Sequence, residues 1–192
     1  MLNMGFREDI ETILKATPDD RQTILFSATM PKEILDITNN YQKNPELIKI
    51  KNKQMTVDSI EQRFYLVDKN KKKSATALLL RYYRPKLAII FCNTKRMVDE
   101  LVDFLGKNKF LAQGLHGDVK QQQRTNVMNQ FKKGTFNILV ATDVAARGID
   151  VNNLDIVINY DLPEDNEYYV HRIGRTGRAG NEGKSFTLID GR

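Results

Sequence analysis

The sequence has little cysteine and no long apolar run. Cys92 is the only cysteine among 192 residues, which excludes an intramolecular disulfide and is typical of a reducing compartment such as the cytoplasm. No apolar stretch approaches the roughly 20 residues that a membrane-spanning helix needs, and no signal peptide opens the chain. Internal repeats and low-complexity segments are absent as well. These absences predict a cytoplasmic protein without a membrane span.

What the chain does contain is the composition of a soluble globular protein, with 41% hydrophobic and 28% charged residues. The formal net charge of +6 and the isoelectric point near 9.3 favour polyanionic partners. A length of 192 residues leaves room for one sizeable core, or for one domain and part of another.

Short apolar runs alternate with segments of helical periodicity. The runs that predict strands are 23–26, 47–50, 64–67, 87–91, 138–141, 156–158 and 186–189. Most are short and rich in β-branched residues, as strands buried on both faces are. Between them, apolar residues recur at helical spacing from Ile10, Ile34, Val98 and Val127 onward. The alternation predicts an α/β fold, a parallel sheet flanked by helices, with ligands at the carboxyl ends of the strands.

A polar stretch at 51–58 separates two parts of unequal size. Residues 1–52 offer only two strands and two helices, too few for an independent doubly wound sheet, whereas 58–192 offers a nearly complete domain. We therefore expect a domain fragment over 1–52, a linker over 53–57 and a second domain over 58–192. The helices of the fragment lack most of the sheet beneath them, so 1–52 is expected to self-associate, to pack on the second domain or to be weakly ordered.

Residues 171–178, His-Arg-Ile-Gly-Arg-Thr-Gly-Arg, are the most informative segment. Arg172, Arg175 and Arg178 recur every three residues, and the glycines between them argue against an ordinary solvent-facing helix. The planar fork of arginine is always charged and matches phosphate oxygens. Three such forks repel one another unless an anion or carboxylates neutralise them. The pattern favours a phosphate-binding edge over a basic solvated turn.

Polar segments also follow several of the expected strands. Ser27-Ala28-Thr29 follows one of them and is, by itself, equally well explained as a helix N-cap. Thr94 follows another and could cap the next helix or donate to a phosphate. His116-Gly117-Asp118 precedes a helix on which Gln121 and Arg124 share one face, an arrangement that is usually structural or solvent-facing.

The segment 141–150 is more distinctive. It combines small residues, which allow close backbone packing, with four polar or charged ones: Thr142, Asp143, Arg147 and Asp150. Tight packing alone does not require those four groups, so a site is favoured here.

In chain order, these segments resemble the motifs of the DEAD-box RNA helicases. The matching patterns are Ser-Ala-Thr, Phe-x-x-Thr, His-Gly-Asp-x-x-Gln-x-x-Arg, Ala-Thr-Asp-x-Ala-Ala-Arg-Gly-Ile-Asp and His-Arg-Ile-Gly-Arg-Thr-Gly-Arg. Their order makes the resemblance specific, and it covers essentially the whole chain. It implies RecA-like domains, with the chain beginning inside the first, just after the Asp-Glu-Ala-Asp box, and running nearly to the end of the second.

The resemblance also implies residue roles. The residues that match arginine fingers on the γ-phosphate of ATP are Arg175 and Arg178, and Asp150 matches a contact to the ATP ribose. The residues that match sequence-independent contacts to RNA phosphates are Thr94, Arg124 and Thr142. The residues that match the coupling of ATP state to domain closure are Ser27, Thr29, His171 and Arg172.

ATP with Mg²⁺ is the implied cofactor, and RNA and the missing N-terminal RecA-like domain are the implied partners. The chain has neither a Gly-x-x-x-x-Gly-Lys-Ser/Thr loop nor an Asp-Glu-Ala-Asp box, so the metal and most phosphate contacts are expected from the missing half. This chain alone is expected neither to hydrolyse ATP nor to unwind RNA. Two alternatives stay open: a non-enzymatic nucleic-acid-binding or partner-docking module of the same fold, and a DNA helicase or translocase, since no motif displays a readable 2′-hydroxyl contact.

Overall fold

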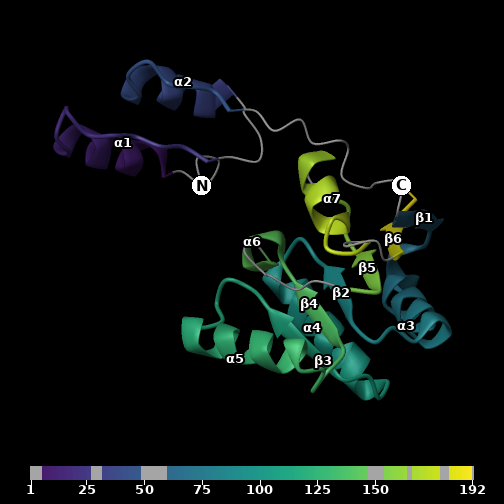
Figure 1. Ribbon diagram of the computed structural model, residues 1–192. Coiled ribbons are helices and arrows are strands. Elements are labelled where there is room, and N and C mark those ends of the chain that lie inside the picture. Colours follow the sequence, from purple (N-terminus) through teal and green to yellow (C-terminus); the bar gives the residue numbers. More distant parts are fainter. Residues whose placement is uncertain are drawn as a thin grey trace. The chain divides into compact units, whose positions relative to one another are not determined.

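The computed structural model describes residues 6–26, 32–48, 60–146, 154–163, 166–177 and 182–191. The chain divides into two compact units, Met1–Asn52 and Lys53–Arg192. In the first unit, α1 spans Arg7–Ala16 and α2 spans Lys32–Tyr41 (Figure 1). Within the described residues, no helix is long and apolar enough to cross a membrane.

The strand predicted at 23–26 is wrong. Residues 21–26 form neither helix nor strand, and Ile24 and Phe26 are 65% and 93% exposed. A strand needs a neighbour for its backbone groups, and the described residues of the first unit contain no strand to pair with. The prediction at 47–50 is wrong for the same reason at residues 47 and 48, and its last two residues lie outside the described ones.

The second unit contains the remaining elements. In chain order they are β1 (Ile60–Leu66), the short 3₁₀ helix η2 (Lys69–Lys71), α3 (Lys72–Tyr83), β2 (Ala88–Phe91), α4 (Lys95–Lys107), β3 (Ala112–Leu115), α5 (Gln121–Lys132), β4 (Ile138–Ala141), α6 (Asp143–Ala146), β5 (Ile156–Asn159), α7 (Asn166–Ile173) and β6 (Gly183–Ile189).

The six strands form one sheet in the order β1-β6-β5-β2-β4-β3, and all neighbouring strands run parallel. The predicted α/β fold with a parallel, helix-flanked sheet is thereby confirmed. β3 was missed, because its sequence Ala-Gln-Gly-Leu has neither a continuous apolar run nor β-branched residues.

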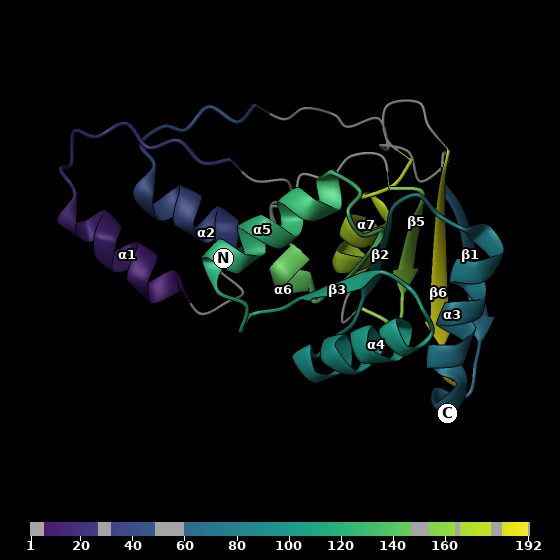
Figure 2. The same cartoon turned by 90° about the horizontal axis from the view of Figure 1, so that it is seen from below.

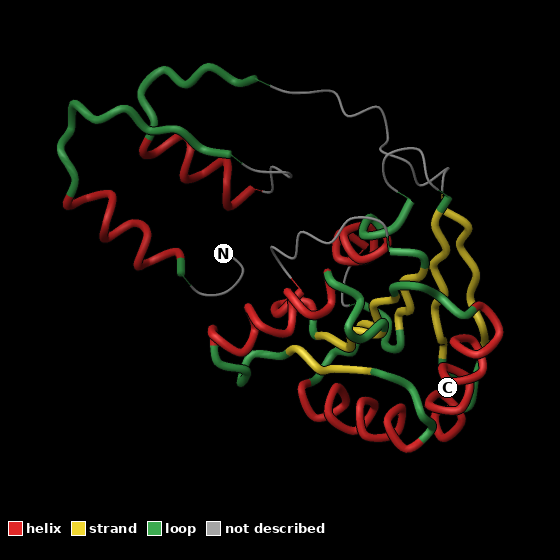
Figure 3. The backbone as a smooth tube through the Cα atoms, turned by 60° about the horizontal axis from the view of Figure 1, so that its bottom comes forward, coloured by secondary structure: helices red, strands yellow, loops and turns green. Residues whose placement is uncertain are grey.

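Two apolar layers hold helices against opposite faces of the sheet. Alternate strand residues such as Ile90 and Val140 join one layer with Leu101 and Leu105 of α4, whereas the residues between them join the other with Phe131 of α5. Accordingly, α4 and α5 lie on opposite sides of β3 in Figures 2 and 3. Full burial of side chains of this size contributes about 1.5–3 kcal/mol each. This double coverage explains why strands β2, β4 and β5 read as continuous apolar runs.

Strands β2, β3, β4 and β5 begin and end in register. Ala88 of β2 pairs with Ile138 of β4 and Ile156 of β5, and Ala112 of β3 also pairs with Ile138. The segments that follow the strands therefore meet at one edge, which we call the carboxyl edge (92–94, 116–118, 142–146 and 160–163). The segments that precede them meet at the opposite amino edge (84–87, 108–111, 133–137 and 154–155).

Candidate functional site

Arg172, in the last turn of α7, is buried at the carboxyl edge with only 1% of its surface exposed. Its Nε and Nη2 donate to the two carboxylate oxygens of Asp143 over 2.7 and 2.6 Å. Nη1 donates to the carbonyl oxygen of Asp161 over 2.6 Å, and Nη2 also donates to Oδ1 of Asn93 over 2.9 Å. The guanidinium carbon lies 5.1 Å from the centroid of the Phe91 ring. One side chain thus joins α7 to the segments after β2, β4 and β5.

This geometry shows how one of the three arginine charges is neutralised. The partner of Arg172 is the carboxylate of Asp143, bound through both oxygens, and charge-assisted bidentate bonds of this kind are the strong ones. Among the described residues, every hydrogen bond of the Arg172 side chain lies within the second unit. The coupling role implied for Arg172 stays a prediction, and the bonds within the unit give the side chain a structural role besides.

Asp161 forms the second acidic centre of this edge. Its carboxylate accepts from the backbone N–H of Asn93 over 3.0 Å and from Nζ of Lys72 over 3.4 Å. Lys72 is only 4% exposed and its ammonium lies 4.9 Å from the Tyr160 ring centroid. The sequence pattern at 69–73 predicts a solvated loop or helix start, with a nucleic-acid role as the less favoured alternative. The helix start is confirmed, but for Lys72 the prediction of solvation is wrong.

Burial also perturbs two neutral groups behind this edge. It raises the pKa of the Cys92 thiol and of the Tyr160 hydroxyl well above their ordinary ranges, and the nearby Asp161 carboxylate raises both further. Cys92 therefore stays a protonated thiol at neutral pH, which suits a packing role in the core.

Thr94 serves as the N-cap of α4, because its Oγ1 accepts from the backbone N–H of Met97 over 3.2 Å. The sequence left open whether this side chain caps a helix or donates to a phosphate. A hydroxyl has one hydrogen to donate and two lone pairs to accept. Capping uses one lone pair, so the hydrogen of Thr94 remains for an outside acceptor.

Thr142 and Arg124 lie at the same edge. Thr142 follows β4, whose last residue Ala141 pairs with Phe91 of the neighbouring β2, so Thr94 and Thr142 continue adjacent strands. Arg124, on the first turn of α5, donates from Nη2 to the carbonyl oxygen of Ala145 over 3.0 Å. Within the described residues, the other N–H groups of its guanidinium make no hydrogen bond. The structure thus brings the three predicted RNA-phosphate residues to the carboxyl edge.

His116 has a structural position beside them. Its Nε2 lies 3.1 Å from Oδ1 of Asp99, and its side chain is mostly buried. Asp118 pairs with Lys95 over 2.7 Å, and the hydrogen bond from Lys95 lowers the pKa of the Asp118 carboxyl. These bonds connect the segment after β3 to the first turns of α4.

Arg175 lies on a segment that is held elsewhere, near the first residues of β5 and β6. The neighbouring Thr176 bridges to Leu154 and its Oγ1 donates to the carbonyl oxygen of Leu154. Gly177 has a φ of +65°, a conformation that glycine favours. A Cβ on Gly183, the first residue of β6, would collide with the backbone N of Gly177 and with the Thr176 side chain. Close packing thus fixes the backbone that carries Arg175.

The remaining candidates are less defined. His171 is exposed on α7. The residues that lie outside the described ones are Ser27, Thr29, Arg147, Asp150 and Arg178. Sequence reasoning missed Lys72 and Asp161 as parts of the carboxyl edge. The position of Asp161 directly after an apolar strand was the available signal.

Comparisons with known proteins agree on one family. The model of the helicase conserved C-terminal domain matches residues 70–180, and the DEAD/DEAH box helicase model matches residues 1–37. The chain is 53% identical over its whole length to the ATP-dependent RNA helicase CshA of Listeria monocytogenes. It is 49% identical over 98% of its length to the DEAD-box ATP-dependent RNA helicase CshA of Bacillus subtilis. The chain spans 37% and 38% of the length of these two relatives.

Solved structures give the same result. A DEAD box protein from Methanococcus jannaschii matches with a TM-score of 0.66 at 46% identity, over 99% of this chain and 51% of that one. Saccharomyces cerevisiae Dbp5 bound to RNA and ADP BeF3 matches with a TM-score of 0.82 at 28% identity, over 96% of this chain and 49% of that one.

Proposed function

Because the chain belongs to the DEAD-box family of RNA helicases, we propose that it is part of an enzyme that couples ATP binding and hydrolysis to local opening of RNA duplexes. In this proposal, residues 1–52 end the first RecA-like domain, 53–57 link the domains and 58–192 form the second. The single cysteine supports a cytoplasmic location.

The observation that carries the proposal is the carboxyl edge built around Arg172. The guanidinium joins α7 to the three segments that follow β2, β4 and β5. Thr94, Arg124 and Thr142 lie at the edge that these bonds hold together. Hydroxyl and guanidinium donors suit phosphate oxygens, and they do not identify the base. We therefore assign these three residues to the RNA backbone, and expect weak sequence preference and strong salt dependence of binding.

The nucleotide contacts are assigned to Arg175, Arg178 and Asp150. An arginine finger acts only if its guanidinium arrives at a defined position, and the packing of Thr176 and Gly183 defines the backbone of Arg175. Arginine fingers contribute about 10³–10⁵ in rate to phosphoryl transfer by neutralising transition-state charge. Asp150 would bind the ribose, so these three residues would contact a nucleotide that is held mainly by the other domain.

ATP is expected with Mg²⁺, held mainly by the first RecA-like domain. Within the described residues, no group of three or more His, Cys, Asp or Glu side chains could hold a metal ion, so no metal ligand is assigned to them. When bound, the cation neutralises phosphate charge. The residues of this chain contribute the fingers, the ribose contact and the RNA contacts.

Closure of the two RecA-like domains would link the two ligands. If ATP and RNA each bind better to the closed arrangement, each strengthens binding of the other. Ser27 and Thr29, from the first domain, and His171 and Arg172, from the second, are assigned to this coupling. Reopening after hydrolysis would release the RNA.

ATP hydrolysis with and without RNA tests the proposal on this chain and on a version extended upstream through the missing half. We expect turnover only from the extended chain, with stimulation by RNA. Arg175→Ala should abolish it and Arg175→Lys should not restore it, because lysine lacks the planar fork. Arg63→Ala removes an equal charge from an exposed pair with Glu61 and serves as the control.

The outcomes separate the alternatives. RNA binding by the extended chain without turnover would favour the non-enzymatic module. Equal stimulation by DNA and RNA of the same sequence would favour a DNA helicase or translocase. Turnover by the present chain alone would contradict the division of labour between the halves.

We propose that the first unit packs on a partner through its exposed apolar residues. α1 has no buried residue, and Ile13 and Leu35 are 63% and 42% exposed. In the full enzyme these faces would pack on the rest of the first domain, and in the isolated chain we expect self-association. Sedimentation measures this directly. A compact monomer, with hydrogen exchange in 1–52 as slow as in the sheet, would overturn the assignment.

A further inference from the structure

The amino edge of the sheet carries an unusual concentration of positive charge. Residues 81–87, 107–111 and 132–137, which are three of its four segments together with the ends of α3, α4 and α5, contain seven cations and no acidic residue. The fourth segment, 154–155, adds Asp155. The cations are exposed, and they are Arg81, Arg84, Lys86, Lys107, Lys109, Lys132 and Lys133. By contrast, the carboxyl edge carries Asp118, Asp143 and Asp161, and its cations, Lys72, Arg124 and Arg172, come from the helices packed on it.

Helix stabilisation does not account for so many cations. The helices α3, α4 and α5 end at this edge, and each carboxyl end carries roughly −0.5 of an elementary charge, so one cation per helix would suffice. The Asp155 carboxylate at this edge accepts from the backbone N–H groups of Lys86 and Leu87 over 2.5 and 3.3 Å. The seven cations therefore outweigh the combined negative charge of the three helix ends and of Asp155.

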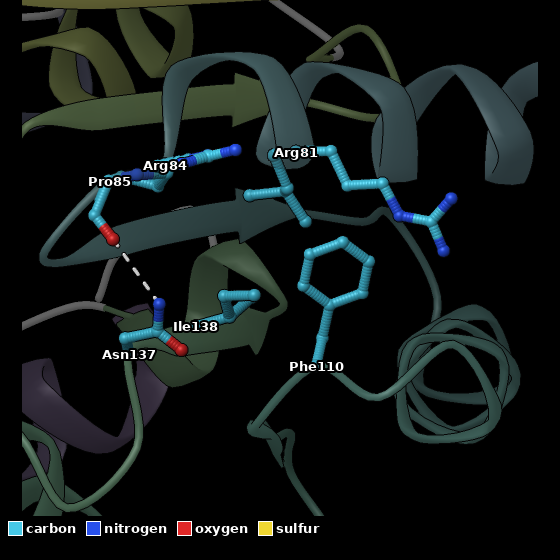
Figure 4. Close-up of a pocket in the computed structure, with 7 residues that line it drawn as sticks. Arg81, Arg84, Pro85, Phe110, Asn137 and Ile138 are labelled. Carbon is cyan, nitrogen blue, oxygen red and sulfur yellow. Dashed lines mark hydrogen bonds between the residues drawn. The ribbon is translucent and has the colours of Figure 1, made fainter.

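A hollow of about 450 Å³ lies among these cations, and its volume is within the ordinary range of ligand sites. Figure 4 shows Arg81, Arg84 and Pro85 along one side of the hollow, with Phe110, Asn137 and Ile138 facing them. Nδ2 of Asn137 donates to the carbonyl oxygen of Pro85 over 3.2 Å, which joins the two sides. The guanidinium carbon of Arg81 lies 5.8 Å from the Phe110 ring centroid.

Backbone bonds fix the segments that surround the hollow. The N–H of Ala88 donates to the carbonyl of Asn137 over 2.9 Å, and the N–H of Ile138 to that of Leu111 over 3.3 Å. The cations therefore project from a rigid edge rather than from independent loops. Within the described residues, the guanidinium of Arg84 makes no hydrogen bond or ion pair, so it is open to an outside anion.

We propose that the amino edge is a second RNA-binding surface, which holds phosphates of a single strand on its cations and one base in the hollow beside Phe110. Arginine planes and aromatic rings are the groups on which unpaired bases stack. An acidic protein segment would use the charge but would have no need of an aromatic face between two arginines. The proposal rests on the proposed function, because that function supplies RNA as the polyanion.

Such a surface would act as a tether. The four-residue strands β2, β4 and β5 separate the two edges by roughly 13 Å, and helices cover both faces of the sheet between them. An RNA that used both edges would therefore have to pass around a helix layer. A second segment of the same RNA bound at the amino edge would raise the local RNA concentration at the carboxyl edge while the latter opens and closes.

The test is RNA binding by this chain with Arg84→Gly and Lys109→Gly combined. Both residues have positive φ, 45° and 66°, where glycine is favoured, so the variant loses two charges without a loss of stability. The control, Lys15→Ala with Lys43→Ala, removes the same charge from the first unit. Anisotropy of labelled single-stranded RNA is followed over a range of salt concentrations.

Loss of two phosphate contacts lowers the salt slope by roughly 1.4 and weakens binding roughly 25-fold at about 0.1 M salt. Phe110→Leu, which keeps an apolar side chain, should weaken binding about 10-fold through lost stacking. The control should change the slope far less. An unchanged slope in the glycine variant, or a loss equal to that of the control, would overturn the proposal.

Failure here is distinguishable from failure of the proposed function. RNA-stimulated turnover of the extended chain together with normal RNA binding by the glycine variant would overturn the second surface alone. Weakened RNA binding by the variant without any turnover in the extended chain would support the surface and overturn the helicase assignment. If the variant loses affinity for an acidic peptide but keeps it for RNA, the edge binds protein and the proposal is wrong.

Discussion

Replacement of Arg172 by alanine should destabilise the second unit by about 3–5 kcal/mol, the cost of leaving one member of a buried ion pair without its partner. The Asp143 side chain is only 23% exposed, so water would replace the lost bidentate bonds incompletely. The Asp161 carbonyl and the Asn93 side chain would lose their donors too. Since small domains are stable by about 5–15 kcal/mol, this is a large share of the total.

Two further variants separate charge from geometry. Arg172→Lys keeps the charge but cannot supply both bonds to Asp143, so a loss of about 1.5–3 kcal/mol is expected. Arg172→Met combined with Asp143→Leu removes the pair altogether, and the loss should be smaller than for Arg172→Ala, because no charge is left unpaired. Arg63→Ala, which breaks an exposed pair, should cost at most about 1 kcal/mol.

Urea unfolding followed by far-UV circular dichroism measures these differences, and no tryptophan is present to serve as a fluorescent probe. Hydrogen exchange of the amides in β2 and β4 confines the measurement to the second unit. A loss from Arg172→Ala no greater than that from Arg63→Ala would refute the view that this arginine holds the carboxyl edge together.

Three other predictions follow from single residues. Gly183→Ala should cost about 1–3 kcal/mol in thermal unfolding, because the added methyl collides with Thr176; an unchanged melting temperature would contradict this. Thr94→Ala should cost about 1 kcal/mol through the lost N-cap and Thr94→Ser much less, and equal losses would argue against capping. The raised pKa of Cys92 means that the fold retains a proton which the unfolded chain releases near pH 8.5. Stability should therefore fall as the pH rises above that value, and thiol reagents should modify Cys92 only on unfolding; rapid modification of the folded chain would be the contrary result.

The sequence was most informative where burial alone determines the pattern. β2, β4 and β5 are covered on both faces, so each has an uninterrupted apolar sequence, which is the pattern of a strand buried on both faces. The same reasoning failed at 23–26, because an apolar run predicts a strand only where a neighbouring strand exists to pair with it. β3 was missed for the opposite reason: its neighbour β4 and the packing of Gly114 against Val98 define it, rather than its own composition.

The carboxyl edge was predictable in its location and less so in its partners. Polar residues after apolar strands indicated the edge, and the structure places Thr94, Arg124 and Thr142 there. The bond between Lys72 and Asp161 joins residues 89 positions apart, a separation at which one sequence contains no signal of contact. A lysine within a run of lysines reads as solvated, and only the tertiary fold brings the carboxylate and the Tyr160 ring to it.

The three arginines of 171–178 show why equal spacing does not imply an equal role. Arg172 belongs to α7 and donates to Asp143, Asn93 and Asp161 within the second unit. The carboxylate of Asp143 therefore already neutralises its charge. Arg175 lies beyond the end of that helix, on backbone positioned by Thr176. A phosphate approaching the segment would therefore meet no net charge at Arg172. Arg172 therefore builds the carboxyl edge, whereas the nucleotide contacts assigned to Arg175 and Arg178 remain a proposal.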